Sequence, residues 1–323
     1  PTYNRKDMLK ECLDSLFNQT YPKDKYEIIV VNDGSTDGTE EVLREYEKKA
    51  PCKFRWFTQQ NRGSAAARNL GIKNARGEII CFIDDDDIAH RDWIKNMVSC
   101  FSDEKIGGVA GKRFPKEPRT LIEQYCERNV SLDYQRLIYA ATCNAAYRRD
   151  VLLELGGFDT SLRTHEDRDL GIRVQLKGYK LKYCKNAITY CRFRSTLKEL
   201  IRQEYRGAIG LMVLGKKYPG YFSPYYYILA YTLKALRASV IGAIKILGHI
   251  MANGRSEIKY TLFEQIINVT LLLTDLAGII RGTLIRYNGE KIYEKIDFIE
   301  RKSLKLFIKK LIVRIYGSRI RGA

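Results

Sequence analysis

The sequence lacks the motifs that mark several common classes of enzyme and binding protein. Neither GxxxxGK[ST] nor GxGxxG occurs in the 323 residues, which argues against P-loop enzymes and dinucleotide-binding enzymes. The eight cysteines form no CxxC pair, so neither a zinc ribbon nor a disulfide framework is indicated. Most of them lie in apolar patterns and are typical of small buried hydrophobic residues, which favours a reducing compartment.

Long apolar runs are also scarce. No stretch free of charged residues reaches about 18 apolar residues, so the sequence predicts no clean transmembrane span. The longest candidate, Tyr218–Leu233, is interrupted by Pro219, Gly220 and Pro224. The chain does not begin with Met, and the residues after Pro1 resemble the exit of a strand whose body is absent. We therefore expect the first strand of the N-terminal domain to be missing from the start of this sequence.

Acidic residues are few in the second part of the chain. Residues 1–192 contain 33 Lys and Arg against 29 Asp and Glu, whereas residues 193–323 contain 23 against 9. A net charge of +14 in that second part, out of +18 in all, suits nucleic acid or an anionic membrane as a partner. Residues 304–315 place apolar side chains at helical spacing among Lys and Arg, which predicts a helix on a membrane surface. Packing of that helix against the rest of the protein, or self-association, is the alternative.

Helical and strand patterns alternate from residue 6 to about 102. Such alternation predicts an α/β fold with right-handed crossovers, a mainly parallel central sheet and flanking helices. The expected helices here are Lys6–Asn18, Thr39–Lys48 and Ala65–Asn74, and the expected strands are Glu27–Val31, Lys53–Phe57 and Ile79–Ile83. Further on we expect a strand over Tyr139–Tyr147, helices over Asp150–Leu155 and Glu166–Lys177, and two short strands within Tyr179–Tyr190. From Ser195 onward helical patterns dominate, so we divide the chain into a catalytic domain over 1–194 and a helical, basic, amphipathic and membrane-associating region over 195–323.

Four consecutive aspartates, Asp84 to Asp87, come directly after the apolar strand Ile79–Ile83. Carboxylates packed this closely repel one another and cannot be buried without partners. A hard divalent cation such as Mg²⁺ or Mn²⁺ would relieve the repulsion, since both prefer oxygen ligands. The carboxyl end of a strand is also where open α/β sheets bind their ligands. A solvated acidic turn is the alternative if the cluster is considered alone.

Two further strand exits place polar groups at the same predicted edge. Tyr3 lies in the first of them, and Asp33 lies in the second, within the turn-rich segment Val31–Asp37. A nucleotide would fit such an edge, with Tyr3 stacking on the base and the carboxylate of Asp33 accepting a base N–H. Turn propensity alone also explains an Asn-Asp-Gly-Ser string, so Asp33 has a purely structural alternative.

Seven segments in order resemble family 2 glycosyltransferases over about residues 1–200. They are Pro1–Arg5, Val31–Asp37, Gly63–Asn69, Asp84–Asp87, Asn144–Asp150, Gly156–Asp159 and Glu166–Leu170. The resemblance implies a GT-A fold and inverting transfer from a nucleotide-diphosphate sugar. It also implies that Tyr3 and Asp33 contact the base, and that Asp84, Asp85 and Arg68 bind the nucleotide sugar. For Arg68, an ion pair with the acidic cluster is the alternative to a contact with the diphosphate.

The resemblance also assigns the metal site and the general base. Asp84 and Asp86 correspond to the two acidic positions of the DxD motif, with Asp86 as the direct Mn²⁺ or Mg²⁺ ligand and Asp84 nearer the ribose or a metal-bound water. Asp85 with Asp87 is the other possible register. Asp167 corresponds to the base that removes the proton of the acceptor hydroxyl, and helix N-terminal carboxylates are the alternative interpretation of its neighbours.

Three more residues become candidates for contacts with the leaving group or acceptor, namely Asn144, Glu166 and Arg192. Many relatives have a His after the late strands that completes the metal site. Here the stretch Ile188–Arg192 contains none, so Arg192 or Arg194 would neutralise the leaving group instead.

The sequence therefore predicts a metal-dependent, inverting glycosyltransferase at the cytoplasmic face of a membrane. Its expected donor is a UDP- or GDP-sugar, its acceptor a glycan or a lipid-linked sugar, and nucleic acid is not an expected partner. A sugar nucleotidyltransferase is one alternative, but it requires a glycine-rich basic loop where this chain has only Asn4–Lys6. A non-catalytic protein that binds membrane or nucleic acid is the other.

Overall fold

The computed structural model describes residues 1–129, 139–219, 255–285 and 287. The amphipathic stripe expected over residues 304–315 lies outside these residues. The helices are α1 (Lys6–Phe17), α2 (Thr39–Lys49), α3 (Ser64–Asn74), α4 (Trp93–Ser99), α5 (Leu121–Asn129), α6 (Arg149–Glu154), α7 (Glu166–Leu176), α8 (Leu197–Lys217) and α10 (Arg255–Leu284), with a 3-10 turn η1 (Lys23–Lys25). The strands are β1 (Glu27–Asn32), β2 (Lys53–Thr58), β3 (Ile79–Ile83), β4 (Ile88–Ala89), β5 (Ile106–Pro115), β6 (Asn144–Arg148) and β7 (Lys180–Cys191).

The α/β architecture follows the predicted pattern, but the strand directions are mixed. Strands β1 and β2 pair in parallel, and the other five lie in the order β3-β6-β5-β7-β4. In that sheet β5 and β7 are parallel, whereas β6 runs antiparallel to both of its neighbours and β4 runs antiparallel to β7. The expected mainly parallel sheet is therefore corrected to a mixed one. Helices still lie between the strands after β4, but β4 and β6 enter the sheet antiparallel, so the later connections are not all βαβ crossovers.

Two expected strand limits also change. The strand predicted over Tyr139–Tyr147 begins only at Asn144. The two strands predicted within Tyr179–Tyr190 form a single strand, β7, whose pairing with β5 is interrupted by a bulge. Gly111 pairs with Cys184 and the next residue, Lys112, with Ile188, so three residues of β7 are left out of the ladder.

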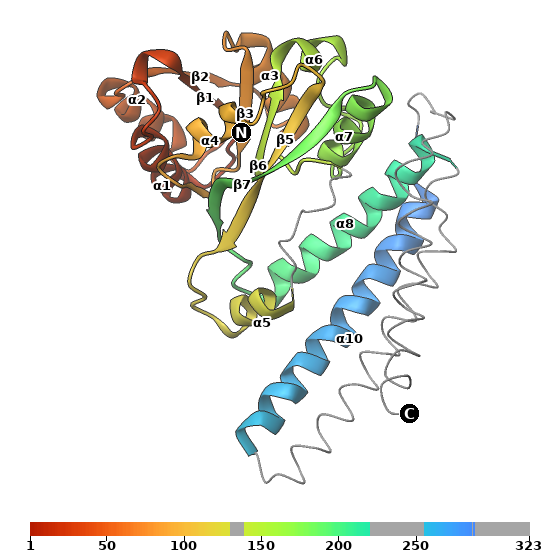
Figure 1. The fold of residues 1–323 in the computed structure, drawn as a ribbon. Coiled ribbons are helices and arrows are strands. Elements are labelled where there is room, and N and C mark those ends of the chain that lie inside the picture. Colours follow the sequence, from red (N-terminus) through yellow and green to blue (C-terminus); the bar gives the residue numbers. More distant parts are fainter. Residues whose placement is uncertain (130–138, 220–254, 286, 288–323) are drawn as a thin grey trace, which may run out of the picture.

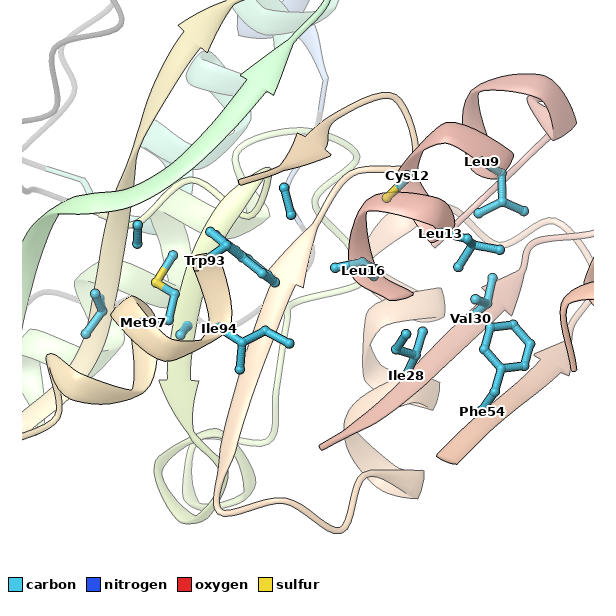
Figure 2. Packing of buried hydrophobic residues seen from close by; sticks show 14 of the residues in the cluster. Leu9, Cys12, Leu13, Leu16, Ile28, Val30, Phe54, Trp93, Ile94 and Met97 are labelled. Carbon is cyan, nitrogen blue, oxygen red and sulfur yellow. The ribbon is translucent and has the colours of Figure 1, made fainter. Parts of the chain in front are cut away.

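The largest core cluster lies between α1, α4 and the first strands. Residues Leu9, Leu13 and Leu16 recur at helical spacing on α1 and pack against β1 and β2, as Figure 2 shows. Trp93 and Met97 of α4 belong to the same cluster and are 2% and 0% exposed. A second cluster on the other side of the sheet includes Phe82, Tyr147, Phe158 and Leu170. The two clusters fix the strand ends from which the polar residues of the site emerge.

The helices α8 and α10 lie side by side and run in the same direction (Figure 1). A Cβ added to Gly278 would lie 2.7 Å from the Cβ of Ala208, and one added to Gly282 would lie 2.7 Å from the Cβ of Met212. Both pairs advance by four residues, which a parallel arrangement requires. The Lys216 ammonium donates hydrogen bonds to the carbonyls of Gly282, Thr283 and Ile285 and so caps the end of α10. Glycine at both positions permits this close approach.

The helix α10 contains a long apolar segment that is not free of charged residues and that the prediction of no clean transmembrane span therefore did not consider. Within the described ranges, residues Thr261–Leu284 are long and apolar enough to cross a bilayer by length and composition, and 22% of the apolar window is buried. A search for charge-free runs overlooks this segment because it contains Glu264, Asp275 and Arg281. Large apolar side chains are exposed along it, including Ile266, Leu273, Ile280 and Leu284.

A buried ionic network joins the end of α8 to α7. The Lys217 ammonium lies 2.6 Å from Asp169 Oδ1 and 2.6 Å from Asp159 Oδ2. Asp169, which is 0% exposed, also accepts hydrogen bonds from Arg173 and from the Tyr218 hydroxyl. Every charge in this network has an opposite partner, as burial requires.

We expect Lys217→Met to lower the free energy of unfolding by about 3–5 kcal/mol, because it removes the cation that the buried Asp169 and the partly buried Asp159 share and leaves Asp169 with Arg173 alone. Urea denaturation followed by circular dichroism measures the change. The matched control is Lys177→Met, which removes the exposed ion pair between Lys177 and Glu154. That control should cost at most about 1 kcal/mol. Equal effects of the two substitutions would show that the buried network does not stabilise the fold.

Candidate active site

The four aspartates after β3 alternate between accessible and buried. The side chains of Asp84 and Asp86 are 34% and 11% exposed, whereas Asp85 and Asp87 are 7% and 1% exposed. Both carboxylate oxygens of Asp85 are bonded, one to the Thr2 hydroxyl at 2.8 Å and one to Arg5 at 3.1 Å. This alternation favours the Asp84/Asp86 register over Asp85/Asp87. Asp85 binds protein partners in this structure, and its predicted contact with the nucleotide sugar remains a prediction.

Arginine side chains offset the negative charge of the cluster. Arg68 donates to Asp84 at 2.9 Å, Arg5 donates to Asp86 at 2.9 Å, and Arg113 donates to both oxygens of Asp87 at 3.0 Å. Burial opposes ionisation of Asp84, but the charges of Arg68 and Arg113 lower its pKa overall. For Asp87 burial dominates and raises the pKa to about 8 despite Arg113. The repulsion between the four carboxylates, from which the sequence analysis predicted a bound divalent cation, is thus offset in part by the guanidinium groups of arginine.

The donor set at Asp84 and Asp86 suits Mg²⁺ or Mn²⁺. Among the described residues, no group of three or more His, Cys, Asp and Glu side chains is placed to hold a metal ion. Mg²⁺ sites, however, commonly use one or two carboxylates together with substrate phosphates rather than a complete protein cage. Arg68 donates to Oδ1 of Asp84, and among the described residues no side chain donates a hydrogen bond to the other oxygen, Oδ2. Two hard oxygen ligands on one turn therefore fit such an ion.

The start of the chain connects the cluster to Asp33. Thr2 donates its backbone N–H to Val31 and accepts from the N–H of Asp33, while its hydroxyl reaches Asp85. Asp33 is 5% exposed, and its carboxylate accepts from the N–H groups of Arg62 and Gly63 at 2.9 Å. The adjacent Tyr3 is 47% exposed. The structure thus brings Tyr3, Asp33 and the aspartates to one edge, as the sequence predicts, with a ring free to stack on a base.

Arg68 connects the acidic cluster to the start of α7. Its guanidinium donates to Asp84 at 2.9 Å and to Glu166 at 2.7 Å, and the Ser64 hydroxyl donates to the same oxygen of Glu166 at 2.9 Å. Arg68 is 7% exposed and Glu166 is 8% exposed. Of the two roles left open for Arg68, the structure shows the ion pair. Glu166 belongs to the same pair, and its predicted contact with the leaving group or acceptor remains a prediction.

Asp167 follows Glu166 in the first turn of α7. Its Oδ1 accepts from the backbone N–H of Arg168 at 2.7 Å. Burial and the adjacent Glu166 charge raise the pKa of Asp167 to about 6, although Arg68 and Arg168 act in the opposite direction. A carboxyl with this pKa is ionised at neutral pH and is a stronger base than an exposed aspartate, as general-base catalysis requires.

The structure gives Asn144 and Arg192 structural roles. Asn144 is 2% exposed; it accepts from the indole N–H of Trp93 at 2.8 Å and donates to the carbonyls of Lys112 and Ala187. These bonds hold three segments together, and the predicted contact of Asn144 with the leaving group or acceptor remains a prediction. Arg192 pairs with Glu11 of α1 at 2.6 Å, and the same contact likewise stays a prediction for Arg192. Arg194, in contrast, lies 3.5 Å from Asp86.

Two of the predicted motifs hold each other in place. Asn69, at the end of the Gly63–Asn69 segment, donates to the carbonyl of Phe158 and accepts from its N–H, both at 2.8 Å. Gly157 has a φ of +73°, and a Cβ there would lie 2.4 Å from Asn69 Oδ1. Only glycine combines this backbone conformation with so close an approach.

Sequence reasoning missed Arg5 and Arg113 as partners of the aspartates. Arg5 is the last residue of the predicted segment Pro1–Arg5, which is a usable signal. Arg113 lies near the end of β5, far from any motif, and only the pairing of β5 with β7 brings it to the cluster.

Comparison with known proteins identifies what the chain is similar to. The family model described as glycosyl transferase family 2 matches residues 1–156, and the one described as glycosyl transferase family group 2 matches residues 79–280. The glycosyltransferase AglE of Haloferax volcanii is 30% identical over 220 residues, which cover 64% of this chain and 69% of AglE. The putative glycosyltransferase EpsH of Bacillus subtilis is 44% identical over 204 residues, covering 59% of this chain and 58% of EpsH.

A third relative covers more of the chain. It is the dolichyl N-acetyl-alpha-D-glucosaminyl phosphate 3-beta-D-2,3-diacetamido-2,3-dideoxy-beta-D-glucuronosyltransferase of Methanococcus voltae, 27% identical over 280 residues, which cover 78% of this chain and 83% of that protein.

Two solved structures share the fold. The mannosyltransferase PcManGT from Pyrobaculum calidifontis, in complex with GDP-Man and Mn²⁺, superposes with a TM-score of 0.58 at 23% identity and 85% coverage of both chains. TarS 1-349 from S. aureus, in complex with UDP-GlcNAc, superposes with a TM-score of 0.51 at 20% identity, covering 92% of this chain and 98% of that one.

Proposed function

Because the chain belongs to glycosyl transferase family 2, we propose that it transfers a sugar with inversion from a UDP- or GDP-sugar to a glycan or lipid-linked acceptor. The fold is GT-A, and the protein is an enzyme of nucleotide-sugar glycosyl transfer. Membership of this family argues against the alternative of a non-catalytic protein that only binds membrane or nucleic acid. The metal, the base, the acceptor class and the membrane belong to the proposal.

The observation that best supports this proposal is the double ion pair of Arg68. One guanidinium holds both Asp84, in the candidate metal turn, and Glu166, the residue before Asp167. A displacement at an anomeric carbon needs charge stabilisation on the departing diphosphate and a base on the acceptor side. Arg68 joins the two turns that would supply these two functions.

The donor end of the site is assigned to Tyr3, Asp33, Asp84 and Asp86. Tyr3 would stack on the base, and the carboxylate of Asp33 is held rigidly by the N–H groups of Arg62 and Gly63 to accept a base N–H. Asp84 and Asp86 would hold Mn²⁺ or Mg²⁺, which when bound offsets the negative charge of the diphosphate. PcManGT was crystallised with GDP-Man and Mn²⁺ and TarS with UDP-GlcNAc, which is why both nucleotides are proposed.

The acceptor end of the site is assigned to Asp167. Its carboxylate would accept the proton of the acceptor hydroxyl as that oxygen attacks the anomeric carbon. Arg194, 3.5 Å from Asp86, adds positive charge where the leaving group would depart. Relatives are named for dolichyl-phosphate-linked and poly(ribitol-phosphate) acceptors, and these names support a glycan or lipid-linked acceptor here.

Membrane association at the cytoplasmic face is the last part of the proposal. The apolar, exposed face of α10 and the net charge of +14 over residues 193–323 both favour contact with an anionic bilayer. All eight cysteines are free thiols, which suits a reducing compartment.

A nucleotide-sugar screen tests the proposal. We expect UDP- or GDP-sugars to raise the melting temperature in the presence of Mn²⁺ and not in EDTA, because Asp84 and Asp86 would hold the ion that offsets the charge of the donor's diphosphate. Incubation of the same donor with lipid-linked acceptors should then release the nucleoside diphosphate. ATP and free phosphate are the controls for nonspecific anion binding. Formation of pyrophosphate from a nucleoside triphosphate and a sugar phosphate would instead indicate a sugar nucleotidyltransferase and contradict the proposal.

A further inference from the structure

The residues just before the candidate base are held by α8, beyond the predicted domain limit at residue 194. The Thr164 hydroxyl donates to the carbonyl of Arg206 at 3.2 Å, and Nε2 of His165 lies 2.9 Å from the carbonyl of Gly207. A carbonyl oxygen only accepts hydrogen bonds, so Nε2 of His165 carries the proton and donates. Figure 1 shows α7 and α8 close together at this point.

Gly210 makes this contact possible. A Cβ at Gly210 would lie 1.7 Å from the Thr164 hydroxyl oxygen and 3.3 Å from Cδ2 of His165. No side chain fits there unless the Thr164 segment moves away. In contrast, a Cβ at Gly207, one helical turn earlier on α8, would meet no atom within 4 Å.

His165 has a backbone conformation that needs such support. Its φ of +63° lies in the left-handed region, which residues with a Cβ seldom adopt without stabilising contacts. His165 is also the N-cap of α7, and its carbonyl accepts the helical hydrogen bond from Asp169 at 3.0 Å. The conformation at His165 therefore sets the direction in which the first turn of α7, with Glu166 and Asp167, leaves the loop.

We propose that α8 positions the general base: its carbonyls at Arg206 and Gly207 fix Thr164 and His165 and thereby orient Asp167 toward the acceptor. This inference rests on the proposed function of Asp167. His165 contacts no reacting atom in the proposed transfer reaction and is therefore a positioning residue. The catalytic unit consequently extends through α8, and α10, packed against α8 at Gly278 and Gly282, supports it from outside.

The charge state of His165 is compatible with this role. Burial, together with the positive charge of Arg168, lowers the pKa of His165 to about 4, although Glu166 and the hydrogen bond to Gly207 act in the opposite direction. The ring therefore stays neutral over the pH range in which Asp167 gains or loses its proton.

The test compares Gly210→Ala with Gly207→Ala in the full chain. The added methyl group at position 210 forces the Thr164 loop away, so kcat should fall roughly 10- to 100-fold, the cost of about 1 Å of misplacement. The donor KM and the affinity for UDP or GDP by calorimetry should stay within about twofold of wild type. Gly207→Ala keeps the backbone carbonyl that His165 contacts and places the same methyl group in open space, so it should lower kcat far less than Gly210→Ala. If the contact between α8 and the Thr164 loop only stabilised the fold, Gly210→Ala would lower the folded fraction, and the folded enzyme would not show a lower kcat at an unchanged donor KM.

Two further variants keep the inference falsifiable if Gly210→Ala folds poorly. Thr164→Ala combined with Gly210→Ala removes the closest atom and should recover folding and part of kcat. His165→Asn tolerates the left-handed conformation but is too short to reach Gly207, and it should lose kcat with donor binding intact. Wild-type kcat in Gly210→Ala and in His165→Asn, with Asp167→Asn inactive, would overturn the positioning role alone. If the wild type transfers no sugar, or Asp167→Asn keeps full activity, the proposed function fails instead.

Discussion

Asp167→Asn should reduce kcat by about 10²- to 10⁴-fold, the usual contribution of a positioned base. The amide is nearly isosteric and can still accept the N–H of Arg168, so the first turn of α7 should persist. It cannot, however, accept the proton of the acceptor hydroxyl. Donor KM and donor affinity should stay close to wild type, because the donor residues lie on the other turns of the site. Steady-state release of the nucleoside diphosphate, with calorimetry of donor binding, measures both.

The matched control for Asp167→Asn is Asp150→Asn. Asp150 also lies in the first turn of a helix, and its Oδ1 accepts the next backbone N–H at 2.8 Å, as that of Asp167 does at 2.7 Å. It is exposed on α6, so its substitution should leave kcat unchanged. In the wild type kcat should fall below about pH 6, because the raised pKa of Asp167 means that the base is protonated below that value. If kcat of Asp167→Asn still fell below about pH 6, the assignment of Asp167 as the general base would be contradicted.

Asp86→Ala should abolish the response to Mn²⁺ and lower kcat/KM about 10²- to 10³-fold, since a metal ion on the diphosphate contributes several kcal/mol to the transition state. The methyl group removes the proposed ligand, and it also leaves Arg5 with one carboxylate, Asp85, instead of two. Titration of Mn²⁺ at fixed donor concentration measures the response. Full metal-dependent turnover in Asp86→Ala would contradict the metal assignment.

Asp87→Asn is the control that distinguishes the two possible DxD pairs, Asp84 with Asp86 and Asp85 with Asp87. Asp87 is 1% exposed and pairs with Arg113, so its substitution should lower the melting temperature while leaving the dependence of the folded enzyme on Mn²⁺ unchanged. The reverse outcome, with the metal response lost in Asp87→Asn and kept in Asp86→Ala, would favour the Asp85/Asp87 register.

Local patterns predicted much of the fold and of the site. The helix α1 and the strand β3 are apparent from apolar spacing alone, and the structure places β3 over the predicted residues. Tyr3, Asp33 and the aspartates lie together as predicted, but β1 and β3 belong to two different sheets, and hydrogen bonds of Thr2 join the two strand ends. Asp84–Asp87 form a turn in which the N–H of Asp87 donates to the carbonyl of Asp84, so strand alternation does not account for their pattern of burial.

Contacts between distant segments could not be predicted. Asn144 resembles a functional polar residue in its motif, yet its bonds to Trp93, Lys112 and Ala187 depend on how β6 and β7 pack. The support of His165 by α8 joins residues 42 apart through a backbone carbonyl, which leaves no mark on residue type. Gly210 is the one residue whose type is consistent with this support, but a glycine within a helix has several possible causes.

The anomeric configuration of the first product tests the central claim most directly. Time-resolved NMR of a turnover with an α-linked nucleotide sugar reports the configuration before the released or transferred sugar can equilibrate. A single displacement assisted by Asp167 predicts a β-configured product and no such product from Asp167→Asn. An α-configured product, or turnover that is unchanged in Asp167→Asn, would contradict the account.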